Sequence, residues 1–351
     1  MNYLKAFLLL PLIMGMIACS GGGTNSSSVE RNADSGGTST PDDTPDDTAT
    51  PADPVDPVTV LLDGNLYFPV AEGVTWHYSN GDQVTFETGR TIRSRNMTAM
   101  LHTSTSMPSE EYFQLTDNEI LYGGFVFPIS IPSVADYEAR VEFHTLRRLY
   151  NHVTDAGQNT FPASKADLIE LSTGETLPVD YDWESQVIAK SMINAGQLGM
   201  VPAVEIALDI DYVVLLEGIV VVQRFPVIST TMWFSPGLGI VARQFGETVI
   251  TLERVDGIQT PVVFEFDQGE GLAQAPKQVL VDGNAVTDTA PTMVVAYGTE
   301  QTGWLDLEFD GTGSWRVSFT GAELPAGIHG AVVQITRDGN RVDVPVSVLV
   351  H

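Results

Sequence analysis

Residues 204–212 are the part of the sequence that most constrains the fold. Val204, Ile206 and Leu208 begin a series in which every second position is apolar, and Glu205 and Asp209 are among the residues between them. Period-two alternation is typical of a β-strand with one buried face. Similar short runs, bounded by turn-forming residues, recur along most of the chain. The sequence therefore predicts an all-β, mainly antiparallel protein.

Residues 59–256 are expected to form the first folded region. Residues 74–78 alternate ahead of the turn Asn80-Gly81-Asp82, which is a strong hairpin signal. Further runs favour strands at 111–115, 120–127, 140–153, 219–225, 230–234, 240–243 and 248–255. Residues 183–193 are the exception, because their pattern also permits a few helical turns.

Residues 257–351 have a tighter rhythm. Seven runs favour strands at 262–266, 278–281, 292–297, 304–309, 314–319, 330–337 and 341–350. Asp310-Gly311 and Asp338-Gly339 supply turns between neighbouring runs. About seven short strands within roughly 90 residues are typical of a β-sandwich. Residues 257–351 are thus expected to form a sandwich after the β-rich first region.

The first 18 residues have the pattern of an export signal. A short start with Lys5 precedes an apolar run over residues 6–14, and small residues follow. The run is shorter than the ~20 residues that span a bilayer core. Ordinary cleavage after Ala18 is disfavoured, because Met16 is a poor residue three positions before the cut.

Met16-Ile17-Ala18-Cys19 resembles the lipobox of bacterial lipoproteins, with Met16 in place of the more usual leucine. Cys19 is the only cysteine in the chain. The resemblance implies that the Cys19 thiol receives a diacylglyceryl group, that the signal is cut before it, and that Ser20 directs the protein to the outer membrane. Two or more acyl chains anchor a protein stably. The alternative is a chance cysteine inside an ordinary secretory signal.

Residues 19–58 are expected to form a disordered, acidic linker. They contain Gly and Ser runs and two tandem copies of Pro-Asp-Asp-Thr, at 41–44 and 45–48. Such a composition buries too little apolar surface to offset the entropy of ordering. The flexible and the stiffer parts together give a reach of several tens of ångströms.

The charge of the chain argues against nucleic acid as a partner. Removal of residues 1–18 leaves 16 basic and 45 acidic residues, a net charge of −29. Such a protein repels phosphate backbones and gains nothing from electrostatic docking on anionic lipid. The covalent lipid on Cys19 is then the expected membrane contact.

Two further resemblances concern the folded regions. Tyr67-Phe68-Pro69 ahead of Trp76, and the run 233–241 around Pro236-Gly237-Leu238-Gly239, resemble exported bacterial lipoproteins with half-barrel folds similar to lipoprotein carriers. That resemblance implies that residues 59–256 form a curved antiparallel sheet or half-barrel with a groove for an apolar ligand. Residues 324–333 and 344–348 resemble the last strands of immunoglobulin-like modules of the BACON type, which implies a spacer or a glycan-adjacent binding unit.

The sequence contains no motif that assigns a catalytic, cofactor-binding or metal-binding residue. The sequence contains no Gly-x-Ser-x-Gly, no phosphate-binding glycine loop and no His-Glu-x-x-His. Some weaker candidates exist, and a structural role is the favoured interpretation of each. For metal binding these are Glu142, His144 and His152, and also Glu205, Asp209 and Asp211. For stacking on sugar or lining a lipid groove they are Trp76, Tyr78, Trp233 and Phe234.

Three functional hypotheses remain at this point. The favoured one is a non-enzymatic, lipid-anchored protein of the cell envelope that presents β domains for binding or scaffolding, with an envelope protein, a glycan or a lipid as partner. The first alternative is a carrier of a lipid or fatty acid in a half-barrel groove. The second is a hydrolase whose site carries no recognised motif.

Overall fold

The computed structural model describes residues 57–70, 73–104, 108–131, 135–152, 159–216, 219–267, 277–280, 292–309, 314–320, 323–337 and 339–351. The export signal, Cys19 and nearly all of the linker lie outside these ranges. So do the predicted turns at Asp310-Gly311 and Asp338. The boundaries proposed at 18, 58 and 256 remain predictions.

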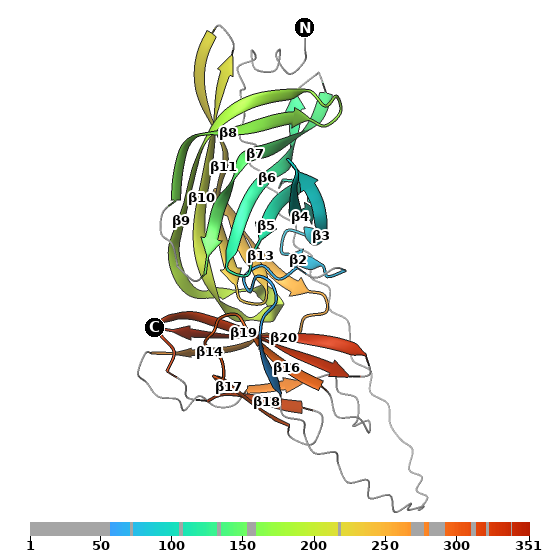
Figure 1. Ribbon diagram of the computed structural model, residues 1–351, viewed down its shortest axis with the longest axis vertical. Coiled ribbons are helices and arrows are strands. Elements are labelled where there is room, and N and C mark those ends of the chain that lie inside the picture. Colours follow the sequence, from blue (N-terminus) through green and yellow to red (C-terminus); the bar gives the residue numbers. More distant parts are fainter. Residues whose placement is uncertain are drawn as a thin grey trace, which may run out of the picture. The chain divides into compact units, whose positions relative to one another are not determined.

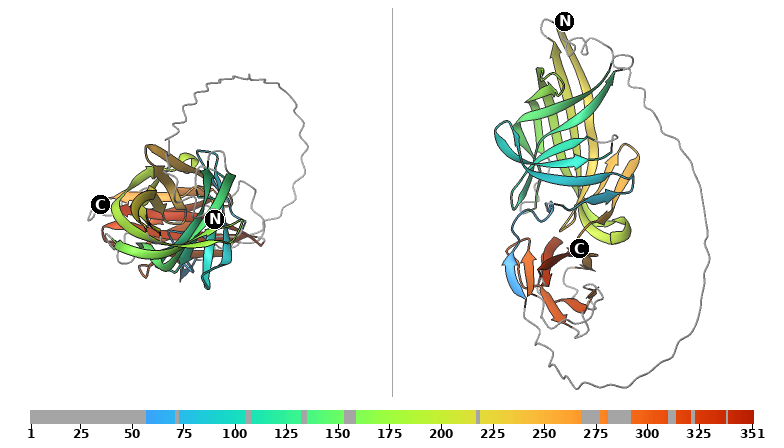
Figure 2. Two further views of the ribbon diagram at one scale, coloured as in Figure 1. Left: turned by 90° about the horizontal axis from the view of Figure 1, so that it is seen from above. Right: turned by 90° about the vertical axis from the view of Figure 1, so that its right-hand side faces the viewer.

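Twelve strands of the described chain form a closed antiparallel barrel (Figures 1 and 2). They are β2 (Trp76–Tyr78), β3 (Gln83–Ile92), β4 (Arg95–His102), β5 (Glu110–Leu115), β6 (Glu119–Ile131), β7 (Ala135–Asn151), β8 (Asn159–Glu170), β9 (Thr176–Asn194), β10 (Met200–Leu216), β11 (Ile219–Ser235), β12 (Gly239–Phe245) and β13 (Thr248–Val255). Each strand pairs with the next in the chain, and β13 pairs with β2 to close the ring. The all-β prediction is therefore confirmed.

The expected half-barrel is a full barrel, because its two end strands meet. Leu252 of β13 lies opposite Tyr78 of β2, and Val255 lies opposite Trp76. Trp76 Nε1 also donates to the Leu238 carbonyl at 2.8 Å, and the Tyr78 hydroxyl donates to the Ile240 carbonyl at 2.7 Å. These bonds tie the short strand β2 to the segment around β12, so the sheet has no open edge at this seam.

The helical alternative at residues 183–193 is wrong, since they belong to strand β9. Glu205 of β10 pairs with Ala189, whereas Ile206 pairs with Val187. Ile188 is therefore an extra residue, a β-bulge, and its side chain is 53% exposed. One inserted residue breaks the period of two, which is why the apolar spacing here imitates a helix.

The interior of the barrel is filled by the chain's own side chains. Fully buried residues with large rings include Trp76, Phe113, Tyr122, Phe143, Tyr181, Trp183 and Phe234. Phe68, from the segment ahead of β2, is 2% exposed and has its ring centroid 4.7 Å from that of Phe113. The segment Leu66–Phe68 thus enters the barrel core from outside the sheet.

Eight further strands form two smaller sheets. They are β1 (Val58–Leu61), β14 (Val262–Phe266), β15 (Lys277–Leu280), β16 (Thr292–Tyr297), β17 (Leu305–Phe309), β18 (Ser314–Phe319), β19 (Gly327–Arg337) and β20 (Asn340–Val350). Five of them form the sheet β1-β16-β19-β20-β14, and three form β15-β18-β17. One apolar core, which includes Phe264, Trp304 and Trp315, draws on strands of both sheets. The immunoglobulin-like assignment stays a prediction.

Strand β1 belongs to the five-stranded sheet and not to the barrel. It pairs in parallel with β16, with Val58 opposite Val294 and Leu61 opposite Tyr297. The chain then crosses to the barrel through Leu66–Phe68. Among the described residues, no helix has the length and the hydrophobicity needed to cross a bilayer.

Candidate functional site

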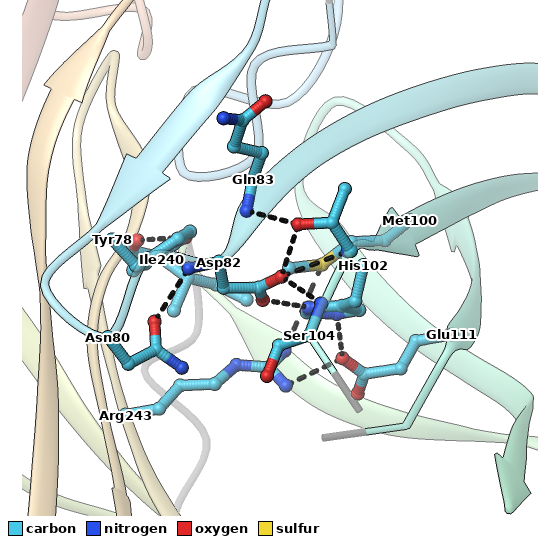
Figure 3. A network of polar contacts seen from close by, with 11 residues as sticks. Tyr78, Asn80, Asp82, Gln83, Met100, His102, Ser104, Glu111, Ile240 and Arg243 are labelled. Atoms are coloured by element: carbon cyan, nitrogen blue, oxygen red, sulfur yellow. Dashed lines mark hydrogen bonds and ion pairs between the residues drawn. The ribbon is translucent and has the colours of Figure 1, made fainter. Parts of the chain in front are cut away.

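Four ionisable side chains meet on the inner face of the barrel. Cross-strand partners share a face of a sheet, so the register can be followed from strand to strand. Val84, buried in the core, lies opposite His102, and buried Met100 lies opposite Glu111. On the far side of the seam, Arg243 lies opposite the buried Met232. Asp82, two residues before Val84, completes the group that is called here the charged network (Figure 3).

The contacts form a continuous chain across the seam. Asp82 Oδ2 lies 2.7 Å from Nδ1 of His102, and Nε2 of the same ring lies 3.0 Å from Oε2 of Glu111. Arg243 Nη1 donates to that same Glu111 oxygen at 2.6 Å. The hydroxyl of Tyr122 donates to the other oxygen, Oε1, at 2.8 Å. The network therefore links β4 and β5 to β12 directly through side chains.

Asp82 is held in place by backbone donors. Its Oδ1 atom accepts hydrogen bonds from the N–H groups of Thr103 and Ser104, at 2.9 and 2.7 Å, and from the Thr103 hydroxyl at 3.2 Å. The carboxylate thus has three donors on one oxygen and the imidazole on the other. The Asn80-Gly81-Asp82 turn, with Gly81 at φ +83°, places Asp82 at the start of β3.

Hydrogen bonding and charge favour the ionised forms of these groups in spite of burial. Burial raises the pKa of Glu111, but the Arg243 guanidinium and His102 outweigh it and lower that pKa to about 2. Burial lowers the pKa of His102, but its bonds to Asp82 and Glu111 leave it raised. The pKa of Asp82 is lowered, since its bonds to His102 and the backbone outweigh burial. In the ionised forms that these shifts favour, two anions and two cations balance.

The charged network has almost no access to solvent. The side chains of Asp82 and His102 are 0% and 1% exposed, and those of Glu111 and Arg243 are 4% and 3% exposed. Because ionised carboxylates only accept hydrogen bonds, both ring nitrogens of His102 must donate. The imidazole then has no free nitrogen to act as a general base. The arrangement stabilises charge and holds strands together, and it offers no group for chemistry on a solute.

One polar atom of the network has no partner in the described structure. Nε of Arg243 is buried and unpaired, and Nη2 lies 3.9 Å from the sulfur of Met100. Elsewhere in the barrel core, a small cavity is lined by Met100, Tyr78 and Trp76, among others. Its size admits about one water molecule. This cavity is too small for a lipid or a sugar.

Three of the four aromatic candidates are core residues: Trp76, Tyr78 and Phe234 are 2%, 6% and 0% exposed. Trp233 is partly buried, and it lies opposite Glu205 on the outer face of the sheet. The three buried rings are not available to stack on a sugar or to line an open groove.

The proposed metal ligands do not come together. Glu142 forms an ion pair with Arg140, and His144 Nε2 lies 3.0 Å from Asp167 Oδ1 on the neighbouring strand. His152 packs instead against the ring of Tyr67, at a centroid distance of 5.7 Å. Among the residues that the structure describes, no group of three His, Cys, Asp or Glu is placed to hold a metal ion.

Glu205, Asp209 and Asp211 fall on the outer face of β10, as the alternation predicts. Asp209 is exposed and the other two are half-buried, whereas Ile206, Leu208 and Ile210 are buried. Asp209 and Asp211 lie opposite Glu184 and Asp182 of β9. Like charges directly opposite each other disfavour pairing slightly, and these residues form a solvated acidic stripe.

Sequence reasoning missed all four members of the charged network as a group. A signal was present: Arg243 ends the otherwise apolar run at 240–243, and Glu111 comes directly before Tyr112 and Phe113. His102 follows the apolar run Ala99-Met100-Leu101. Alternation alone does not tell which of two faces is buried in strands this short.

Comparisons with known proteins place the chain in no family. No protein-family model and no curated protein matches it. Two solved structures of the endo-fucoidan hydrolase MfFcnA4 from glycoside hydrolase family 107, one of them of a variant, match with a TM-score of 0.19 and 11% identity. The alignments cover 84% and 83% of this chain and 43% of those chains, so this chain spans less than half of their length. A TM-score this low indicates neither a shared fold nor a shared activity.

Proposed function

We propose that this chain is an exported lipoprotein of the bacterial outer membrane, anchored by acyl chains on Cys19, that presents its β structure for binding or scaffolding. One observation carries the proposal: the inside of the barrel is occupied by the protein's own side chains. The charged groups that meet there form hydrogen bonds and ion pairs with one another. Any partner therefore has to be met at the outer surface.

The anchor is tested by metabolic labelling with palmitate. The wild-type chain is expected to take up the label and to enter the detergent phase on phase separation, and Cys19→Ala is expected to lose both properties. Ser20→Ala is the matched control, because it changes the neighbouring position and keeps the thiol. Label on the Cys19→Ala chain would overturn the anchor.

The carrier alternative receives no support from the barrel interior. A fatty acid needs a continuous apolar space, and the cavity beside Trp76 admits about one water molecule. Titration with a fluorescent fatty acid is expected to show no saturable binding to the barrel. Saturable binding that is lost when Phe68 is replaced by a charged residue would restore this alternative.

The hydrolase alternative stays a hypothesis for experiment. It is tested by assaying the purified full chain against panels of glycans and esters. Turnover that persists in Glu111→Gln and His102→Gln variants would place a catalytic site elsewhere on the molecule, away from the charged network.

A further inference from the structure

The pairing between β7 and β8 covers only part of both strands. Residues 139–143 of β7 pair with residues 166–170 of β8, and the residues of β7 that follow have no partner in the described part of β8. A continued ladder would place Arg147 opposite Pro162. Proline has no N–H to donate, and it interrupts a ladder of hydrogen bonds. The barrel wall therefore has a local break in its backbone pairing at Arg147.

A β-bulge in β8 lies at the same break. The register with β9 shifts between Phe161 and Ser164, where β8 has one residue more than its partner. Ala163, within the bulge, has a φ of +51°, which is uncommon for a residue other than glycine. Its N–H group donates to Oδ1 of Asp182 at 2.8 Å, which holds the bulge in place. Bulges re-aim side chains, and this one directs Phe161 and Ser164 toward Arg147.

The guanidinium of Arg147 is held by two hydroxyls and two rings. Nε donates to the Tyr181 hydroxyl at 3.1 Å, and Nη2 donates to the Ser164 hydroxyl. The central carbon lies 4.4 Å from the ring centroid of Phe161 and 5.9 Å from that of Tyr181, where a cation is attracted to an aromatic face. Nη1 has no partner within the described residues and is not one of their buried unpaired atoms. It is therefore open to solvent.

The groups that contact Arg147 are all neutral. Arg95 is the other described arginine without a carboxylate, and its amino groups donate to main-chain carbonyls instead. The remaining arginines with described side chains each pair with a carboxylate, and they are Arg90, Arg93, Arg140, Arg148, Arg243, Arg254, Arg316 and Arg341. Acids are not scarce, since the chain has 45 of them against 17 basic residues. A partly buried charge is costly unless an opposite charge compensates it, and the half-buried Arg147 lacks that charge.

We propose that Arg147 is the centre of a binding site for an oxyanion, namely the carboxylate, phosphate or sulfate group of a ligand. A planar guanidinium binds such groups through two parallel N–H···O bonds. The hydroxyls occupy its Nε–Nη2 side, which leaves the Nη1–Nη2 end for the anion. Ser164 and Tyr181 are positioning residues that fix the plane of the guanidinium. The half-buried Arg147 is reached from solvent at the break between β7 and β8.

Thermal unfolding of the full chain tests the site. Sodium sulfate, phosphate and acetate are each compared with sodium chloride at equal ionic strength. An ion that binds only the folded state raises Tm in a saturable way, whereas the general stabilisation by excluded salts continues to rise with concentration. We expect a saturable rise in the wild type, its loss in Arg147→Gln, and a smaller rise in Arg147→Lys, which keeps the charge without the planar fork.

Arg316→Gln is the matched control, because Arg316 is exposed and pairs with Glu308, and it should keep the full rise in Tm. The three salts also identify the group that binds. A rise with sulfate and phosphate alone assigns a tetrahedral anion, and a rise with acetate alone assigns a carboxylate. Equal rises in the wild type and in Arg147→Gln would overturn the proposal and leave Arg147 a purely structural side chain.

Chemical modification by phenylglyoxal, which reacts with accessible arginines, tests the site without a substitution. The bound anion should slow the modification of Arg147 in a saturable way, as followed by mass spectrometry of peptides. Arg254, exposed and paired with Asp256, should react at an unchanged rate. Equal protection of the two arginines would also overturn the proposal. Neither measurement involves Cys19, so failure of this site and failure of the anchor are told apart.

Discussion

Glu111 is the residue on which the charged network converges. Its carboxylate receives hydrogen bonds from His102, Arg243 and Tyr122. Burying ions is costly unless they are paired, and removing one partner leaves the other charge uncompensated. Replacing Glu111 is therefore expected to lower the stability of the fold more than breaking a surface ion pair does.

Glu111→Gln is expected to lower the free energy of unfolding by about 3–5 kcal/mol, because the Arg243 charge stays buried without its partner. Denaturant unfolding measures the change. Glu87→Gln is the matched control on the neighbouring hairpin: its side chain is 57% exposed and pairs with Arg90 at 3.1 Å, so it should cost about 0–1 kcal/mol. Similar losses of unfolding free energy in the two variants would contradict this role of Glu111.

The same network predicts how stability depends on pH. The pKa of His102 is raised above 6.5, so its contribution is fully present below about pH 6.5 and is lost as pH rises through the folded-state pKa. The pKa of Glu111 falls from 4.5 to about 2, so its contribution is present above about pH 4.5 and is lost as pH falls toward 2. Stability should be greatest between these limits.

Urea unfolding at a series of pH values checks this profile. Four ionisable groups affect the pKa of His102 or lie beside it, namely Asp82, Glu111, Arg243 and the hydroxyl of Tyr78. His102→Gln should remove the loss of stability on the alkaline side of pH 6.5 while keeping the loss in acid. An alkaline slope that is unchanged in His102→Gln would assign it to another group.

At the scale of elements, the turn between β11 and β12 contains two nearby glycines that differ in how well they tolerate a side chain. Gly237 and Gly239 both have positive φ, at +73° and +82°. A Cβ on Gly237 would lie 2.8 Å from Cβ of Pro345, whereas one on Gly239 would find its nearest neighbour at 3.6 Å. Both substitutions strain the backbone, but only one also clashes.

Gly239→Ala is therefore expected to cost about 1 kcal/mol through backbone strain. Gly237→Ala should cost about 1–3 kcal/mol more, because Pro345 has to move. Thermal unfolding of the two variants, measured side by side, tests the difference. Equal shifts in Tm would mean that Pro345 moves aside freely.

Strand positions were predictable wherever the alternation is uninterrupted. The strands at 262–266, 292–297 and 314–319 occur where the pattern put them. Strands β8 and β9 were not recognised, because β9 contains the bulge at Ile188 and β8 has mixed polarity. A bulge is set by the partner strand, so its position is not visible in the strand that contains it.

At the scale of the whole molecule, the segment Leu66–Phe68 takes part in both sets of strands. Leu66 belongs to the barrel core, and its side chain occupies the space that a Cβ on Gly298 or Gly330 would need. The Leu66 carbonyl also accepts a hydrogen bond from the Gly237 N–H at 2.8 Å. These contacts predict that the barrel and the two smaller sheets unfold together.

Leu66→Ala should cost about 2–5 kcal/mol and should split a single calorimetric transition into two. Leu171→Ala is the control, because that side chain is 39% exposed. Two transitions already present in the wild-type protein would show that Leu66 does not couple the two sets of strands.

The amino-acid sequence by itself determined the all-β class, most of the strands and the absence of familiar catalytic motifs, because alternation and motifs are local properties. Closure of the barrel, the entry of Phe68 into its core and the meeting of Arg243 with Glu111 were decided only by the tertiary structure. The last two residues are 132 positions apart. Contacts between residues so far apart in the sequence form only when the sheet closes and β13 pairs with β2. No local sequence pattern predicts that closure.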